Sequence, residues 1–451
     1  SNFNQWTMMS YVGRVNYGLL DRYLLTASLR YDGSSRLADG HKWALFPSVA
    51  VAWRITEESF VKDSKWLSNL KLRLSYGQAG NANSVSPYAS EGNISGSVYY
   101  PFGTSTSVGN LPANIANPLL TWERTSEYNV GFDFGFLGQC ISGNIEYYNR
   151  TTNDLLMGRN IPVHLGYSSV VSNVGSVRNS GFELQLNTVN IASKNFTWNT
   201  TINLAYNKNE IVSLADEEDL SNYSVNLKGM RGRYSDKRFI GKPVDTNWNQ
   251  NTIGVWQLGE EEEAAKYGCV PGNFKIKDYN NDGKLTDDDY IIDGKRTPDW
   301  TGGMTNMFKY RDFDLSFHMY FQLGATQYDR FFENFALEWN SQNFNNLRTN
   351  YWTPENPSNT MGRPSQMGSR GNIAYEKTDF LKVSYVTLGY SLSKKLLSKW
   401  GLSNARIYVT VQNPLILTKF RGLDPEQPDI TNIGDTDGMT KNTLLGVNVS
   451  F

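Results

Sequence analysis

Long apolar runs are missing from this sequence. No stretch of about 18 consecutive apolar residues occurs among its 451 residues, which excludes a transmembrane helix. A membrane β-barrel stays possible, because a barrel strand of about 9 to 11 residues needs apolar side chains only at alternate positions. A secretory signal is also missing from the first residues, so we expect a mature or internal segment.

The sequence also has no excess of one charge sign, and it contains little histidine and cysteine. The 43 basic and 44 acidic residues nearly cancel, which argues against nucleic acid as a partner. The three histidines lie far apart, and no catalytic Ser/His/Asp set, phosphate-binding loop or zinc spacing occurs. We therefore predict that the chain is not an enzyme. In a membrane β-barrel, Cys140 would lie in a short turn and Cys269 in a long loop at the opposite membrane face. The two are then expected about 30 Å apart, too far for a disulfide.

What the chain does contain is alternation with a period of two. Its last residues, 443–451, read TLLGVNVSF, with Leu445, Val447, Val449 and Phe451 on one side of an extended strand. A soluble protein could also end in this way. The ending resembles the last strand of outer-membrane β-barrels, whose terminal Phe is read by the insertion machinery. That resemblance implies an insertion signal at Phe451.

The same pattern recurs along the chain and predicts about thirteen strands. In residues 70–76 leucines alternate with Lys71, Arg73 and Ser75, an arrangement that suits a wet lumen rather than a soluble core. The apolar phase slips between Val383 and Val386, which predicts a β-bulge. The clearest alternating segments are 11–19, 23–31, 49–53, 70–76, 128–136, 141–147, 182–186, 196–206, 313–321, 380–392, 407–411 and 443–451.

The connections between these segments alternate strictly between short and long. Short turns on the periplasmic side and long loops outside are the pattern of outer-membrane barrels. The sequence therefore predicts an all-β fold, an antiparallel transmembrane β-barrel segment with long extracellular loops, in the outer membrane and in contact with the lipid bilayer. The long connections are residues 32–42, 80–120, 157–175, 213–300, 326–375 and 419–441.

Strand parity gives a further hypothesis. Single-chain bacterial barrels have even strand numbers and both termini in the periplasm. If the last of about thirteen strands ends in the periplasm, the first begins outside the cell. We therefore expect residues 1–451 to be the C-terminal portion of a longer barrel, with a start inside an external loop.

One long loop contains the spacing of a calcium-binding loop. Glycine stands at position 6, Gly283, where the sharp turn needs it. Position 12 is Asp rather than the longer Glu, and no clear helices flank the loop. The alternative is a solvated Asn/Asp/Gly-rich turn. The predicted ligands of a structural Ca²⁺ at positions 1, 3, 5, 7, 9 and 12 are Asp278, Asn280, Asp282, the carbonyl of Lys284, Thr286 and Asp289.

Aromatic side chains crowd the predicted external loops, next to amides. Flat ring faces beside amide hydrogen-bonding groups suit sugar rings or peptide backbones. The alternative is that these rings pack the loops against each other or form the interfacial aromatic girdle. The candidate ligand-binding residues are Trp248, Trp256, Trp339, Tyr351 and Trp352. Residues 260–268, EEEEAAKYG, predict a solvated surface helix that ends at Gly268.

Several longer motifs resemble one family. The run PDWTGGMTN followed by FDLSF, the opening YVGRVNY and DRYLLTASLRYDGSSR, LRLSYGQAGN, VRNSGFELQL and FLKVSYVTLGY are similar to SusC/RagA-type TonB-dependent outer-membrane transporters of Bacteroidetes. The similarity runs from Tyr11 to Phe451. The family's barrel has about 22 strands, so this chain would be its C-terminal part.

The resemblance implies an active importer. In this family a plug domain and a TonB-contacting segment precede the barrel, a SusD-like surface lipoprotein covers it, and oligosaccharides or peptides are taken up. The plug and the N-terminal strands are not among these residues. Loop Trp and Tyr favour an oligosaccharide over a peptide. Three other classes stay open: a passive porin, a barrel enzyme without a convincing catalytic set, and an adhesive scaffold.

Overall fold

The computed structural model describes residues 4–161, 164, 166–167, 169–214, 224–225, 231–233, 238–337, 349–364, 369–428 and 439–451. The chain divides into two compact units. The first comprises residues 1–183, 208–224 and 231–244, and the second comprises residues 184–207, 225–230 and 245–451. Strands β11 (Ser176–Ala192) and β12 (Phe196–Ser213) contribute residues to both units.

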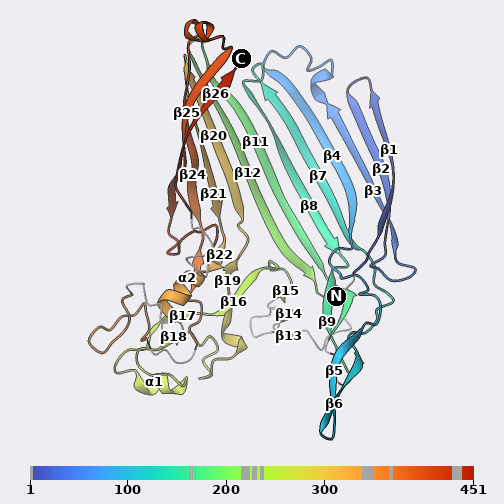
Figure 1. The fold of residues 1–451 in the computed structure, drawn as a ribbon, viewed down its shortest axis with the longest axis vertical. Helices are drawn as coiled ribbons and strands as arrows, with labels where there is room; N and C mark the ends of the chain where they lie inside the picture. The colour runs from blue at the N-terminus through green and yellow to red at the C-terminus, as the bar shows by residue number, and fades with distance from the viewer. Residues whose placement is uncertain are drawn as a thin grey trace. The chain divides into compact units, whose positions relative to one another are not determined.

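Thirteen strands form the main sheet and follow one another in chain order (Figure 1). The pairs from β1 to β8 and from β12 to β26 are antiparallel, as the alternation predicted. The strands are β1 (Met8–Leu19), β2 (Tyr23–Ser34), β3 (Trp43–Arg54), β4 (Leu67–Asn81), β7 (Glu123–Phe136), β8 (Ile141–Asn153), β11 (Ser176–Ala192), β12 (Phe196–Ser213), β20 (Trp300–Tyr310), β21 (Phe313–Leu323), β24 (Phe380–Ser391), β25 (Asn404–Thr418) and β26 (Asn442–Ser450).

One face of the sheet in the first unit is apolar and exposed. The strand register aligns apolar side chains across six neighbouring strands, because directly paired residues of adjacent strands point to the same face of the sheet. Val51, Leu74 and Val130 in one such row are 43%, 42% and 38% exposed. That row is Tyr17, Leu25, Val51, Leu74, Val130 and Tyr147.

The second unit repeats the arrangement across its own strands. Leu388 and Leu445, in one row, are 54% and 71% exposed. A soluble monomer rarely exposes a continuous apolar face of this size, whereas hydrocarbon tolerates it. The row is Trp198, Phe308, Leu315, Leu388, Val409 and Leu445.

The predicted β-bulge is confirmed in β24. His318 pairs with Tyr385 and Met319 with Val383, so Ser384 is the extra residue. The shift recurs where β24 pairs with β25. The extra residue resets the phase, which keeps Val383 and Val386 on the same apolar face despite their odd spacing.

Short turns and long loops separate to opposite ends of the strands in each unit (Figure 1). The turn between β1 and β2 is three residues long, Leu20 to Arg22, and φ is 54° at Leu20 and 52° at Asp21. Two positive φ values are typical of a turn whose twist matches that of the flanking strands. The loop-length pattern that the sequence predicted is therefore present.

The loops of the first unit contain their own strands and core. Trp122 is 1% exposed, and its indole nitrogen donates to the Lys42 carbonyl at 3.0 Å. Phe46 contacts it edge-on, with ring centroids 5.5 Å apart. The loop strands of this unit are β5 (Ile94–Phe102), β6 (Ser105–Pro112), β9 (Leu156–Asn160), β10 (Ser169–Asn173), β14 (Arg231–Arg233) and β15 (Arg238–Phe239), and β13 (Ser224–Val225) has one residue in each unit.

The loops of the second unit are larger and contain most of the helical turns. The acidic run predicted as a helix is α1 (Glu261–Lys266), followed by Gly268 at φ 69°. In the described part of the chain no helix has the length and apolar character that a membrane crossing needs. The other loop elements are β16 (Thr246–Gln250), β17 (Thr252–Val255), β18 (Phe274–Ile276), β19 (Tyr290–Lys295), β22 (Thr326–Tyr328), α2 (Arg330–Phe332) and β23 (Tyr375–Lys377).

A glycine in a middle strand lets an ion pair form between the two strands beside it. Arg406 of β25 reaches Asp314 of β21, with Nε to Oδ1 at 2.9 Å, across Gly389 of β24. A Cβ atom at Gly389 would lie 2.5 Å from the guanidinium and 2.6 Å from the carboxylate. Any side chain there must therefore displace the ion pair.

Gly389→Ala is expected to destabilise the folded protein by about 1–3 kcal/mol, because overpacking forces the Arg406–Asp314 pair to move. Gly13→Ala is the matched control, since its Cβ would have no atom within 4 Å. It should stay within about 0.5 kcal/mol of wild type. Urea unfolding in detergent micelles measures both, and equal effects would contradict the glycine's role.

Candidate functional site

The candidate site lies in the loops of the second unit. Two short antiparallel pairs, β16 with β19 and β17 with β18, form its frame. A buried apolar cluster fills the space beside this frame, so the loops have a core of their own. Its members are Val255, Phe274, Phe332, Leu337, Trp352, Met361 and Ala374.

Three of the predicted ligand-binding tryptophans are buried. Trp248, Trp256 and Trp352 are 3%, 5% and 5% exposed. Trp248 stacks on Tyr290, and Trp256 stacks on Tyr267, with centroids 5.9 and 6.1 Å apart. These rings pack the loops internally, which is the alternative that the sequence left open. Trp339, the fourth predicted tryptophan, lies outside the described residues.

Tyr351 differs from the tryptophans because it is 41% exposed. It lines a groove of about 590 Å³, which we call the Tyr351 groove. The groove combines apolar and proline surfaces with one guanidinium, a mixture suited to an amphiphilic ring or an extended chain. Its lining is Leu258, Val270, Pro271, Tyr351, Trp352, Thr353, Pro354, Arg363 and Pro364.

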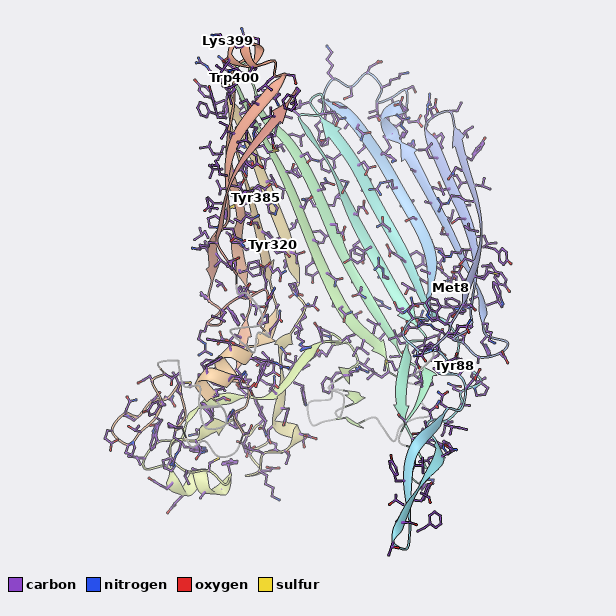
Figure 2. The ribbon with its side chains drawn as sticks, viewed as in Figure 1. Met8, Tyr88, Tyr320, Tyr385, Lys399 and Trp400 are labelled. Carbon is purple, nitrogen blue, oxygen red and sulfur yellow. The ribbon has the colours of Figure 1, made fainter. Side chains whose placement is uncertain are left out.

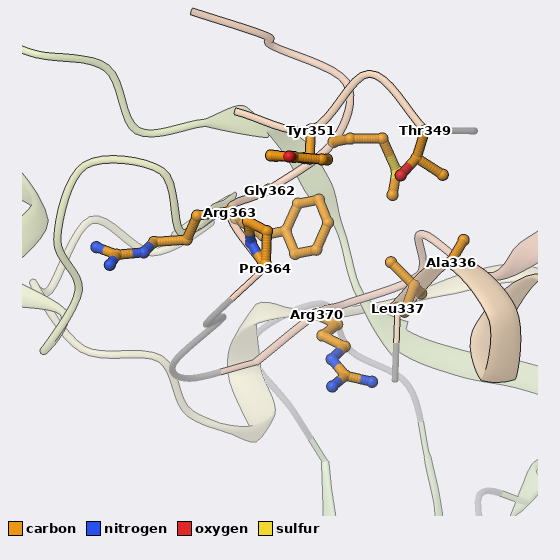
Figure 3. Close-up of a pocket in the computed structure, with 10 residues that line it drawn as sticks. Ala336, Leu337, Thr349, Tyr351, Gly362, Arg363, Pro364 and Arg370 are labelled. Carbon is orange, nitrogen blue, oxygen red and sulfur yellow. The ribbon is translucent and has the colours of Figure 1, made fainter. Parts of the chain in front are cut away.

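A second, narrower cavity adjoins the groove (Figure 3). The two share Tyr351, Arg363 and Pro364, and the second adds Arg370 to its lining. Two arginines in one small region favour ligand groups with oxygen lone pairs, because a guanidinium only donates hydrogen bonds.

Trp352 is fixed at the base of this site by hydrogen bonds and close packing. Its indole nitrogen donates to the Gln257 side-chain oxygen at 3.0 Å. The Gln257 amide in turn donates to the Val255 carbonyl at 2.8 Å. Gly272, at φ 89°, lies so close that a Cβ there would be 2.4 Å from the Trp352 ring. The backbone beside the ring therefore requires glycine for two separate reasons.

The predicted calcium loop forms a tight turn stabilised by its own side chains. Asn281 and Gly283 have φ of 57° and 78°. The Asp278 carboxylate accepts hydrogen bonds from the Gly283 and Asn281 amides at 3.0 and 2.6 Å. Asp289 is fully buried and accepts from the backbone amides of Tyr279 and Thr286. Desolvation opposes ionisation of Asp278, but these hydrogen bonds outweigh it and lower its pKa.

The acidic side chains of this loop do not converge on one point. Among the described residues, no group of three or more His, Cys, Asp or Glu lies close enough together to hold a metal ion. Asn280 and Asp282 bond instead to each other and to the following backbone amides. The donor atoms are those of a hard-cation loop, and the calcium prediction stays a prediction.

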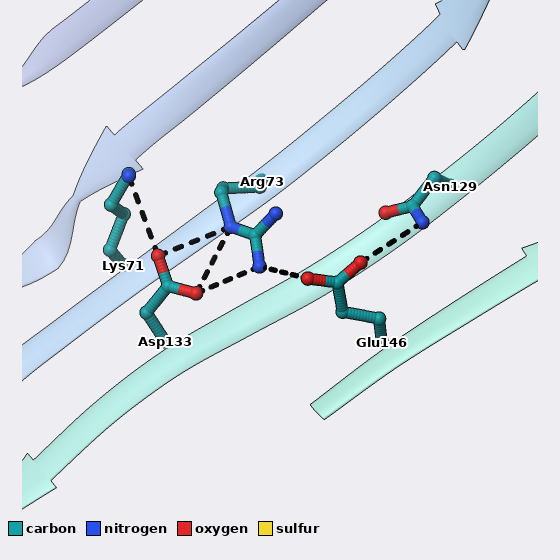
Figure 4. A network of polar contacts seen from close by, with 5 residues as sticks. All are labelled: Lys71, Arg73, Asn129, Asp133 and Glu146. Carbon is teal, nitrogen blue, oxygen red and sulfur yellow. Dashed lines mark hydrogen bonds and ion pairs between the residues drawn. The ribbon is translucent and has the colours of Figure 1, made fainter. Parts of the chain in front are cut away.

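The polar face of the first unit contains a charge network (Figure 4). Arg73 donates to Asp133 at 2.8 Å and to Glu146 at 2.5 Å, and Lys71 lies 3.4 Å from Asp133. Asn129 donates to the far oxygen of Glu146. These side chains come from β4, β7 and β8 and are about a quarter to a third exposed, so the alternate charges of residues 70–76 do share one hydrated face.

Other predicted features are found as follows. Both cysteines are free, as predicted, and Phe451 follows β26 with 94% of its surface exposed. Sequence reasoning missed the prolines and Arg363 of the Tyr351 groove, because segments 258–271 and 351–364 lie far apart in sequence and come together only in the folded chain. It also missed the pairing of Arg73 with Glu146, which depends on strand register.

A family model described as "TonB dependent receptor-like, beta-barrel" matches residues 1–413. The TonB-dependent receptor SusC of Bacteroides thetaiotaomicron is 35% identical over 93% of this chain and 41% of its own length. The TonB-dependent receptor P26 of Formosa agariphila is 32% identical over the whole chain and 47% of its own length. The chain thus spans less than half the length of these relatives.

A solved structure described as the RagAB peptide transporter has the same fold. Its TM-score is 0.78 at 25% sequence identity, and the match covers 99% of this chain and 48% of that one.

Gly272→Ala is expected to loosen the Tyr351 groove, because the new Cβ pushes against Trp352. The cost is about 1–3 kcal/mol for the clash, on top of the strain of a positive φ. Gly259→Ala is the matched control: φ there is 90°, but a Cβ would have no atom within 4 Å. Hydrogen exchange of residues 349–364 should rise in Gly272→Ala only, and equal rises would show that backbone strain alone is responsible.

Proposed function

Since this chain belongs to the TonB-dependent receptor β-barrel family, as a SusC/RagA-type member, we propose that it forms the transmembrane wall and outer loops of an active outer-membrane importer of oligosaccharides. The observation that carries the proposal is the 35% identity with SusC over 93% of the chain. The apolar exposed face and the opposite charged face of the sheet support it, because a transporter wall must meet lipid on one side and water on the other.

In this proposal the chain's own residues bind the ligand and provide a wet passage. Tyr351 offers a ring face for stacking on a sugar, and Arg363 offers hydrogen-bond donors to sugar hydroxyls. The network around Arg73 keeps one face of the sheet hydrated. The plug, the contact with TonB and a SusD-like lipoprotein lid are further parts of the proposed importer, outside residues 1–451.

Peptide import is the second candidate. It is favoured by the similarity to RagAB, whose structure is described as that of a peptide transporter. The Tyr351 groove does not separate the two, because proline and aromatic surfaces also accept extended peptides. Uptake of labelled oligosaccharide and oligopeptide pools by cells with and without the gene decides between them. Uptake of peptides alone would overturn the oligosaccharide proposal.

A passive porin is the remaining alternative from another class. Uptake by the importer should stop when TonB is deleted, whereas a porin should continue to pass solutes and conduct ions in planar bilayers. Uptake that is unchanged without TonB would contradict active import.

Tyr351→Ala is expected to weaken ligand binding about tenfold, because loss of one stacking ring removes about 1.5 kcal/mol. Tyr99→Ala is the control: Tyr99 is 67% exposed on the β5–β6 hairpin and lines no part of the groove. Calorimetric titration of the complete protein with the imported oligosaccharide measures both variants. Equal binding by wild type and Tyr351→Ala would remove the groove from the proposal.

We also propose that Ca²⁺ binds the loop from Asp278 to Asp289 and orders it. The support is the spacing of the oxygen donors in the sequence and the turn at Gly283. The ion would be held by Asp278, Asn280, Asp282, Lys284, Thr286 and Asp289, with no part in catalysis.

Asp289→Asn is expected to weaken calcium binding by at least about tenfold, because it removes a charged ligand. Asp287→Asn is the matched control, since Asp287 is an exposed acid of the same loop at a position that is not a ligand. Terbium luminescence sensitised by Tyr279, with competition by Ca²⁺, measures the affinity. If both variants bind alike, or wild type binds no ion, the loop is a solvated turn.

A further inference from the structure

A second groove lies on the outer face of the second unit, where β21, β24 and β25 meet the long loops. Its volume is about 920 Å³. Leu323, Leu381 and Leu417 expose 42%, 37% and 56% of their surfaces there. We call it the lysine-rimmed groove. Its lining is Phe321, Leu323, Lys377, Asp379, Phe380, Leu381, Ile416, Leu417, Thr418 and Lys419.

The floor of this groove continues the apolar face. Phe321 pairs with Leu381, and Leu381 pairs with Leu417, so the three side chains share one face across three strands. The bulge at Ser384 keeps them in phase with the apolar rows farther along the strands. A soluble ligand would have to cross lipid to reach this floor, whereas an alkyl chain of the membrane already lies against it.

The rim carries two cations. Lys377 and Lys419 are both exposed, and neither has an ion-pair partner among the residues that the structure describes. The neighbouring acid, Asp379, accepts a hydrogen bond from the Gly324 amide at 2.7 Å. The other nearby cations are already paired, Lys382 with Glu426 and Arg421 with Glu376. Two ammonium groups at the edge of an apolar surface can therefore receive an anion.

We propose that the lysine-rimmed groove binds a membrane lipid with a phosphorylated headgroup. The alkyl chains contact Leu323, Leu381 and Leu417, and the phosphate lies between Lys377 and Lys419. The site stands apart from the Tyr351 groove and does not depend on what the protein transports. It would anchor the ends of β21, β24 and β25 at the membrane surface, beside the loops.

The test is a native mass spectrometry titration of the complete protein in detergent with lipid A that carries two phosphates. Lys377→Gln/Lys419→Gln should bind it about 25-fold more weakly, from about fivefold for each lysine near the membrane surface. Lys377→Arg/Lys419→Arg should bind like wild type. Lys399→Gln is the control, because Lys399 is exposed beside Trp400 at the short-turn end of the strands (Figure 2).

Three probes separate the possible occupants. Dephosphorylated lipid A with the same acyl chains should bind wild type as weakly as phosphorylated lipid A binds the double variant. Inorganic phosphate alone should not compete at equal concentration. If it competes fully, or if the dephosphorylated lipid binds equally, the lipid proposal is overturned.

The remaining outcomes also decide the matter. Equal lipid binding by wild type and the double variant would overturn the proposal, as would co-purification of a stoichiometric protein, without lipid, that the double variant releases. If the double variant does not fold, as judged by heat-modifiable mobility on gels, each single Lys→Gln variant should still show the fivefold loss. No loss in either would count against the site.

Discussion

The need to pair every backbone hydrogen-bonding group in hydrocarbon governs this structure. Water cannot satisfy an amide or carbonyl inside a membrane, so the strand ladders must do so. Neighbouring strands are accordingly long and antiparallel, with registers that continue over nine or more residue pairs in β1·β2, β4·β7 and β25·β26. Side chains are then free to differ between the two faces, and the apolar rows and the charge network around Arg73 both depend on that difference.

Each face of the sheet has its own chemistry. The apolar rows meet lipid and need no specific partners. On the polar face, Arg73 and Arg406 are only partly exposed, and each pairs with acids of other strands. Glycines make this possible: Gly131 lies between Arg73 and Glu146, and Gly389 lies between Arg406 and Asp314. The same device occurs in both units, which indicates that it follows from the register rather than from one local contact.

The long loops are stabilised in a different way, by a buried apolar core like that of a small soluble domain. They bury Trp122 in one unit and Trp352 in the other, together with apolar neighbours. Indole nitrogens that are buried in this way donate to oxygens of distant segments, the Lys42 carbonyl and the Gln257 side chain. The aromatic content of the loops therefore serves first to order them. Only the rings left at the surface, such as Tyr351, can meet a ligand.

The sequence by itself determined the strands, their number in the main sheet, the bulge after Val383, the short helix before Gly268 and the separation of short turns from long loops. All of these follow from local periodicity and turn chemistry, which a single segment expresses without help. The tertiary structure decided which aromatic rings are buried. Trp256 and Tyr351 look alike in sequence, but packing between distant segments buries one and exposes the other. It also decided which charges pair, because a register shift of one residue would move Arg73 to the opposite face, away from Glu146.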